Sequence, residues 1–167
     1  MAAVSSPSSA PAVTEEDATL AAANVLLRIA ARSVLEVEEI VSTPQLRVLI
    51  LIAASGPQNL GAVAAELGVH PSNATRTCER LVQSGMVART EDPNDRRYVQ
   101  LALTATGQAL VNQVLDQRRS AMSAVLARMN VEDRSVVAAA FQTFADAAGG
   151  NGTQDGRFVF SLQPGSQ

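Results

Sequence analysis

The stretch at residues 60–103 constrains the fold of this chain more than any other. It reads as a short apolar helix, a turn at Val69-His70-Pro71, a second helix that ends before Gly85, and two strands joined by the charged loop EDPNDRR. Gly68 ends the first of these helices, and Gly85 is a candidate for a left-handed residue at the end of the second. This order predicts a winged helix-turn-helix, a fold that presents one helix to a groove of DNA.

The second helix of this stretch has one apolar face and one polar face. Ala74, Cys78 and Leu81 recur at helical spacing, so we expect them to face the core. Residues on or beside the other face carry donors and acceptors that read base edges and phosphates: Ser72, Asn73, Thr75, Arg76 and Arg80. The two arginines could be solvated helix charges, but the motif around them favours DNA contact.

The loop between the strands holds a second group of candidates. Asp-Pro-Asn-Asp is turn chemistry, and Arg96 and Arg97 follow at or just after the tip. A guanidinium in this place could enter a minor groove. Asp95 and Arg97 also have a purely structural interpretation, as a turn ion pair worth less than about 1 kcal/mol when exposed.

Charge alone argues weakly against DNA binding, because the chain has a net charge of −3 and phosphate contacts supply most non-specific affinity. Its distribution matters more. Residues 1–42 hold six carboxylates and two arginines, whereas residues 70–100 hold five arginines and four carboxylates. The basic side chains are therefore concentrated where the motif needs them.

Long helices flank the motif. Apolar spacing predicts helices at about 15–41, 105–129 and 131–148, the last with five apolar residues facing inward: Val136, Val137, Ala140, Phe141 and Phe144. Between the first helix and the motif, Thr43 is expected to cap an apolar, buried helix that has Pro44 at its first position. The Ser-, Ala- and Pro-rich residues 1–13 are expected to be disordered.

Several functional classes are excluded or disfavoured. The chain has no Gly-rich phosphate loop, no Gly-x-Ser-x-Gly elbow and no acidic pair in a catalytic setting, so we expect no enzyme and no cofactor. A single Cys and a single His do not build a Cys/His zinc site, and no metal is expected.

Cys78 invites a redox-sensor hypothesis, but its inward position favours a small core residue. No apolar run of about 18 residues lacks a charge, so a membrane span is not expected.

The chain resembles the multiple-antibiotic-resistance regulator (MarR) family of bacterial transcription factors over about 15–148. The match rests on Ser-Thr-Pro-Gln at 42–45, on the stretch from Leu60 to Arg89, and on Asp-Pro-Asn-Asp-Arg-Arg at 92–97 followed by Leu-Thr-Ala-Thr-Gly at 103–107. The last pair of motifs is the most specific. The resemblance implies a mainly α fold with a small β-wing, in which long N- and C-terminal helices form a dimerisation region.

The resemblance also implies a function. Each subunit of a homodimer would insert its second motif helix into a major groove of a pseudo-palindromic operator. Asp95 would orient Arg97, and Arg97 or Arg96 would enter the minor groove. In many members a small, often phenolic molecule weakens DNA binding; here few aromatics are present, and Asn24 and Arg28 are the only weak effector candidates on the first helix.

These points predict a cytoplasmic, DNA-binding transcriptional regulator that is a homodimeric repressor released by a small molecule, with no membrane partner. The alternative is a winged-helix protein-interaction module that binds no DNA. The expected organisation is a disordered segment at 1–13, a MarR-type domain at 14–148 and a tail of unknown role at 149–167. Within the domain, 14–42 and 105–148 would dimerise and 43–104 would form the winged helix-turn-helix.

Overall fold

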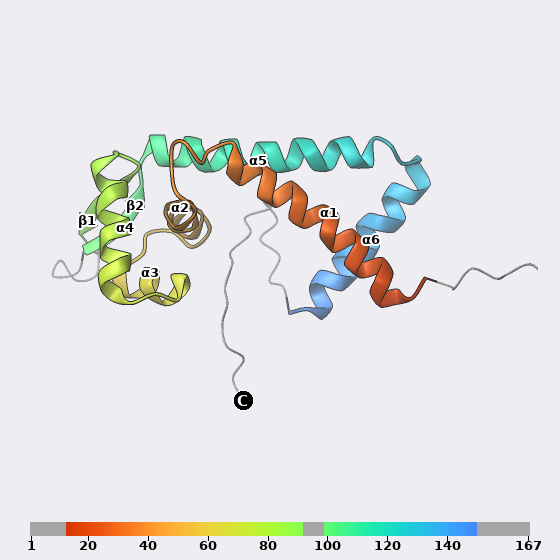
Figure 1. Cartoon of the computed structure of the whole chain (residues 1–167), viewed down its shortest axis with the longest axis horizontal. Coiled ribbons are helices and arrows are strands. Elements are labelled where there is room, and N and C mark those ends of the chain that lie inside the picture. Colours follow the sequence, from red (N-terminus) through yellow and green to blue (C-terminus); the bar gives the residue numbers. More distant parts are fainter. Residues whose placement is uncertain (1–12, 92–98, 150–167) are drawn as a thin grey trace, which may run out of the picture.

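The computed structural model describes residues 13–91 and 99–149. In this part of the chain a winged-helix unit lies at one end, and the long N- and C-terminal helices extend toward the other (Figure 1). The elements follow in the order α1 Glu15–Leu35, α2 Thr43–Ser55, α3 Leu60–Leu67, α4 Pro71–Gln83, β1 Val87–Glu91, β2 Val99–Leu103, α5 Ala105–Leu126 and α6 Val131–Ala147. The predicted class, mainly α with a small two-stranded wing, is confirmed.

The core of the winged-helix unit forms around α2. Seven consecutive or nearly consecutive residues of this helix are buried: Leu46, Val48, Leu49, Ile50, Leu51, Ile52 and Ala53. The helices α3, α4 and α5 and the strand β2 pack against it. Helix α2 is therefore the buried central helix that its apolar sequence predicts.

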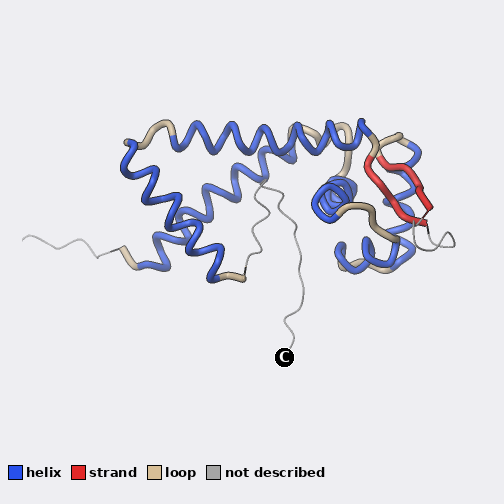
Figure 2. Tube along the Cα trace, turned by 180° about the vertical axis from the view of Figure 1, so that it is seen from behind, coloured by secondary structure: helices blue, strands red, loops and turns tan. Residues whose placement is uncertain are grey.

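The two strands form an antiparallel hairpin whose register pairs Val87 with Leu103 and Glu91 with Val99. Figure 2 shows this hairpin at the edge of the winged-helix unit. Gln58 adds an isolated bridge to the other side of β2, because its N–H and C=O both bond to Leu101, at 3.0 and 2.8 Å. The loop before α3 is thereby tied to the wing.

Residue type accounts for most of the helix starts. Asn59 and Asn130 cap α3 and α6, each accepting a hydrogen bond from a backbone N–H three residues on. The N-cap of α2, however, is Ser42 and not Thr43. The backbone N–H and the hydroxyl of Ser42 both donate to the Gln45 side chain, at 2.8 and 2.9 Å, so the capping begins one residue earlier.

Helix α1 ends at Leu35 rather than near residue 41. Three glutamates follow at 36, 38 and 39, and carboxylates are unfavourable at the negative end of a helix dipole. The chain turns here instead, which buries Val37 and Val41, 1% and 4% exposed, in the core of the winged-helix unit. Hydrophobic periodicity predicted one continuous helix to about residue 41 and did not predict this turn.

Helix α6 also departs from the expectation. It forms where predicted, but none of its residues is buried. Val136, Phe141 and Phe144 are 67%, 44% and 59% exposed. The apolar face of α6 therefore does not turn into the core of its own chain, and the prediction that these residues face inward is wrong for the single chain.

Helix α1 is long and apolar enough, by length and composition, to cross a membrane, with a mean hydropathy of 1.4 over its most apolar window. Only 6% of that window is buried. Leu20 and Leu27 are both more than 60% exposed. This is weak evidence for a membrane span, because apolar helix faces that meet another protein chain pass the same test.

Candidate nucleic-acid interface

Helix α4 presents a polar face to solvent. Its inner residues Ala74, Cys78 and Leu81 are at most 2% exposed and belong to the core, as predicted. On the outer side Ser72, Asn73, Arg76 and Arg80 are exposed, and Thr75 is half-buried. The structure thus brings these five sequence-predicted residues onto one accessible helix.

The two arginines of this face are uncompensated. With the other described residues, the side chains of Arg76 and Arg80 form neither a hydrogen bond nor an ion pair. Thr75, by contrast, donates its hydroxyl to the carbonyl of Pro71 at 2.9 Å, so this oxygen remains an acceptor only. Two exposed guanidinium groups, each with five free donors, are suited to phosphates and to guanine edges.

His70 is the N-cap of α4. Its Nδ1 accepts a hydrogen bond from the N–H of Ser72 at 3.4 Å and lies 2.9 Å from the Ser72 hydroxyl. His70 therefore satisfies a backbone N–H at the start of α4, as an N-cap does. Pro71 follows at the first helical position, where its lack of an N–H costs nothing.

The other end of α4 is joined to the first turn of α5. Gly85 adopts φ +70°, the left-handed conformation expected after the helix. The hydroxyl of Thr104 donates to the carbonyl of Gly85 at 2.6 Å and accepts from the N–H of Gly107 at 3.2 Å. Thr104 thereby caps α5 and holds the end of α4 at once. This accounts physically for the Leu-Thr-x-x-Gly motif.

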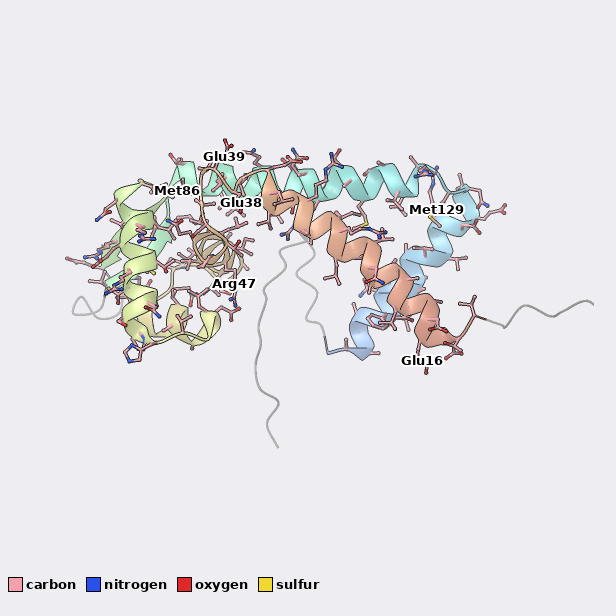
Figure 3. All side chains as sticks on the ribbon, viewed as in Figure 1. Glu16, Glu38, Glu39, Arg47, Met86 and Met129 are labelled. Atoms are coloured by element: carbon pink, nitrogen blue, oxygen red, sulfur yellow. The ribbon has the colours of Figure 1, made fainter. Side chains whose placement is uncertain are left out.

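One contact that positions the site was missed by the sequence analysis. Arg47, on α2, donates from Nη2 to the carbonyl of Glu66 at 3.0 Å, near the C-terminal end of α3. Figure 3 shows Arg47 beside α3, on the side of the unit away from Met86. A cation is favourable at a helix C-terminus. The bond from Arg47 joins α2 to the end of α3, which in turn packs against α4. The 19-residue separation leaves no local sequence signal for this contact.

The wing candidates Asp95, Arg96 and Arg97 lie outside the described residues. The strands on either side of them are present, and Arg89 is exposed on β1. Arg89 is therefore a further exposed cation, on the strand that follows α4.

A cavity of about 240 Å³ lies between α1 and α5, with both apolar and polar lining residues: Ile29, Arg32, Ser33, Glu36, Gln117, Ser120, Ala121 and Ala124. Next to it, Nε of Arg118 donates to the Ser33 hydroxyl at 2.8 Å, and burial lowers the pKa of this arginine. The two effector candidates, Asn24 and Arg28, are exposed on α1 and do not line this cavity.

The buried thiol of Cys78 leads to a first prediction. The side chain is 2% exposed, and its burial raises the pKa of the thiol more than nearby Arg89 lowers it. Because the thiolate is the reactive form, we expect a thiol-labelling reagent to modify the native protein far more slowly than the urea-unfolded protein. Peroxide should leave DNA binding unchanged. An oxidant response that Cys78→Ser abolishes would show that the residue is a sensor.

No group of three or more His, Cys, Asp or Glu that could hold a metal ion occurs in the described ranges.

Comparisons with known proteins agree with this geometry. The MarR family model matches residues 41–99. The HTH-type transcriptional repressor MdtR of Bacillus subtilis is 32% identical over 108 residues, which cover 65% of this chain and 70% of that protein. The crystal structure of RV1404 from Mycobacterium tuberculosis has a TM-score of 0.71 and 34% identity, and the match covers 86% of this chain and 99% of that one.

A more distant likeness concerns the fold alone. A variant of MepR from S. aureus, bound to an oligodeoxyribonucleotide, has a TM-score of 0.60 at 13% identity, covering 81% of this chain and 98% of that one. Together with the exposed α4 face and the paired strands beside it, the matches in sequence and in structure show that this chain belongs to the MarR family of DNA-binding transcriptional regulators and is not an enzyme.

Proposed function

We propose that the chain is a cytoplasmic, homodimeric repressor that binds a pseudo-palindromic operator. The observation that carries the proposal is the outer face of α4, where the side chains of Arg76 and Arg80 are exposed and form no hydrogen bond or ion pair with other described residues. The relative MdtR is named a repressor. The reading residues are Ser72, Asn73, Thr75, Arg76 and Arg80, and the wing adds Arg96 and Arg97, with Asp95 orienting Arg97.

The proposed dimer rests on unpartnered apolar surface. Leu20 and Leu27 on α1, and Val136, Phe141 and Phe144 on α6, are each more than 40% exposed. Exposed apolar faces of this extent mark protein–protein contact surfaces. A second copy of the chain that covers these faces gives residues 14–42 and 105–148 a role in assembly. No membrane is then needed to cover the exposed apolar side chains. Such a dimer would place its two α4 helices about 34–36 Å apart, one turn of DNA.

The proposed effector is a small molecule that weakens operator binding. The cavity between α1 and α5 is large enough for a compound of about one ring, slightly below the usual range of ligand sites. It lies where α5, which continues from the wing, meets α1. A ligand there would change how the winged-helix unit is held. Asn24 and Arg28 remain secondary candidates at the exposed surface.

A mobility-shift titration with the DNA upstream of the protein's own gene tests the proposal. We expect tight binding at 50 mM salt and a loss of about 10³-fold in affinity at 200 mM, because several phosphate contacts release counterions. We expect the dimer to bind a DNA fragment that carries both half-sites of the palindrome much more tightly than a fragment that carries one half-site. No binding at low salt, either to this DNA or to a selected random pool, would favour the alternative of a protein-interaction module.

A further inference from the structure

Helix α6 is held by its first turns and by little else. None of its residues is buried, and it packs closely against no other element in the described ranges. Figure 1 shows α6 folding back from the far end of α5. The direction in which its apolar face points therefore depends on the connection between the two helices, which we call the elbow, residues 127–130.

The elbow is closed by one arginine. From the first turns of α6, Arg134 reaches back to the end of α5. Its Nε donates to the carbonyl of Met129 at 3.1 Å, and its Nη2 donates to the carbonyls of Met129 and Ala127 at 2.9 and 3.3 Å. Met129 marks this junction in Figure 3. Asn130 completes the elbow, because its side chain bonds to both the N–H and the carboxylate of Asp133.

These contacts suit the chemistry of a helix C-terminus. The last carbonyls of an α-helix have no partner within the helix and carry its negative partial charge. The guanidinium of Arg134 bonds to the carbonyl of Ala127, the C-cap of α5, and to that of Met129 in the elbow, through charge-assisted hydrogen bonds. Because the donor belongs to α6, these bonds hold the elbow against the first turns of α6 and so fix the angle at which α6 departs from α5.

We propose that Arg134 is a positioning residue for assembly, which holds α6 at the angle at which its apolar face packs on a second copy of the chain. This inference rests on the proposed homodimer. The occupant is a second copy because α1 carries a matching exposed apolar face in the same half of the molecule. Preorganised elements associate more tightly, because less freedom is lost on binding. Without Arg134 the elbow is free to bend, and each association must first order it.

Arg134→Ala tests the proposal, with Arg128→Ala as the matched control. Arg128 lies in the elbow and carries the same charge, but within the described part of the chain it makes no side-chain hydrogen bond or ion pair. We expect sedimentation equilibrium to show a dimer dissociation constant raised about tenfold or more by Arg134→Ala and unchanged by Arg128→Ala. Arg134→Lys, which keeps the charge and one donor group, should recover part of the loss.

A second measurement separates orientation from a general loss of structure. Spin labels on exposed positions of α5 and α6, in a chain diluted with unlabelled protein, report the distance between the two helices within one subunit. Arg134→Ala should broaden this distribution while the circular dichroism stays that of a helical protein. A variant that dimerises as tightly as the unaltered chain, or keeps a narrow distribution, would overturn the role of Arg134. An unaltered chain that remains monomeric would instead contradict the homodimer itself, and with it the assembly role.

Discussion

Replacing Arg76 and Arg80 together by alanine is expected to lower operator affinity by about 100-fold or more. Each lost base or phosphate contact costs about 1–3 kcal/mol, and both subunits of the dimer lose their contacts. Both side chains are exposed and form no hydrogen bond or ion pair with other described residues, so the fold should be unaffected. Mobility shift across a series of salt concentrations is the measurement. The salt dependence should also become shallower, by about one unit of slope for each phosphate contact removed.

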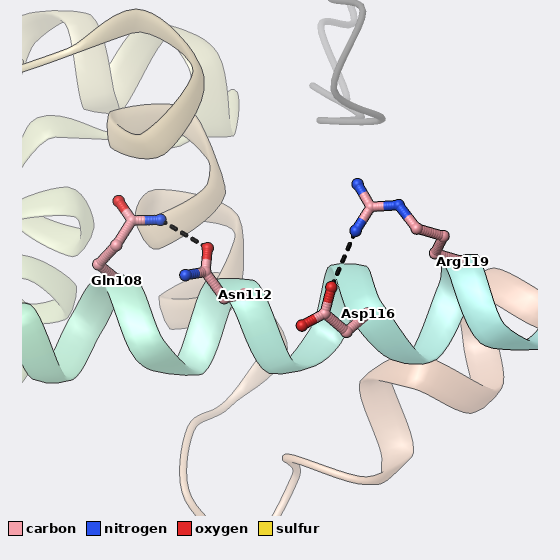
Figure 4. A network of polar contacts seen from close by, with 4 residues as sticks. All are labelled: Gln108, Asn112, Asp116 and Arg119. Atoms are coloured by element: carbon pink, nitrogen blue, oxygen red, sulfur yellow. Dashed lines mark hydrogen bonds and ion pairs between the residues drawn. The ribbon is translucent and has the colours of Figure 1, made fainter.

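The control for this experiment is Arg119→Ala on α5. Arg119 is 64% exposed and pairs with Asp116 at 2.8 Å, on the stretch of α5 drawn in Figure 4, where Gln108 and Asn112 form a similar surface bond. Arg119 carries the same charge as either one of the two α4 arginines, but it lies on α5, away from α4. Equal losses for Arg119→Ala and for the α4 double variant would mean that net charge, rather than a contact from α4, determines affinity.

Local signals predicted the winged-helix unit well. The caps at Asn59, Thr104 and Asn130 and the left-handed Gly85 all stand where the residue types placed them, because each depends on bonds to residues only a few positions away. The inner and outer faces of α4 followed from the helical repeat for the same reason. This is why the candidate DNA face could be located before the structure was known.

Contacts made at a distance could not be predicted in this way. The early end of α1 depends on burying Val37 and Val41 against a core assembled from later residues. The exposed face of α6 depends on surface that belongs, on our proposal, to another chain. Only the fold shows that Arg47 binds a carbonyl near the end of α3 and that Arg134 binds the carbonyls of the elbow. The apolar pattern predicts that a helix face is covered, but it does not predict which element or which chain covers it.

Gly107 is the residue whose replacement should most disturb the fold. It is buried in the first turn of α5, and a Cβ built on it would lie 2.1 Å from the carbonyl oxygen of Met86. That carbonyl accepts the backbone hydrogen bond of Thr104 at 3.1 Å, so it cannot move away without breaking the connection between α4, the wing and α5. A methyl group at residue 107 must therefore displace α5 from this junction.

We expect Gly107→Ala to lower the free energy of unfolding by about 2–3 kcal/mol, as overpacking of a buried site does, measured by urea denaturation. Gly61→Ala is the matched control. Gly61 is also helical but exposed, and its added methyl group would meet only the Asn59 side chain, at 3.2 Å. Alanine favours a helix over glycine by about 1 kcal/mol, so this variant should be as stable as the original or slightly more so. If both variants proved equally stable, the close approach of α5 to Met86 would not constrain the fold. Because the same junction orients α4, Gly107→Ala should also weaken operator binding at temperatures where it remains folded.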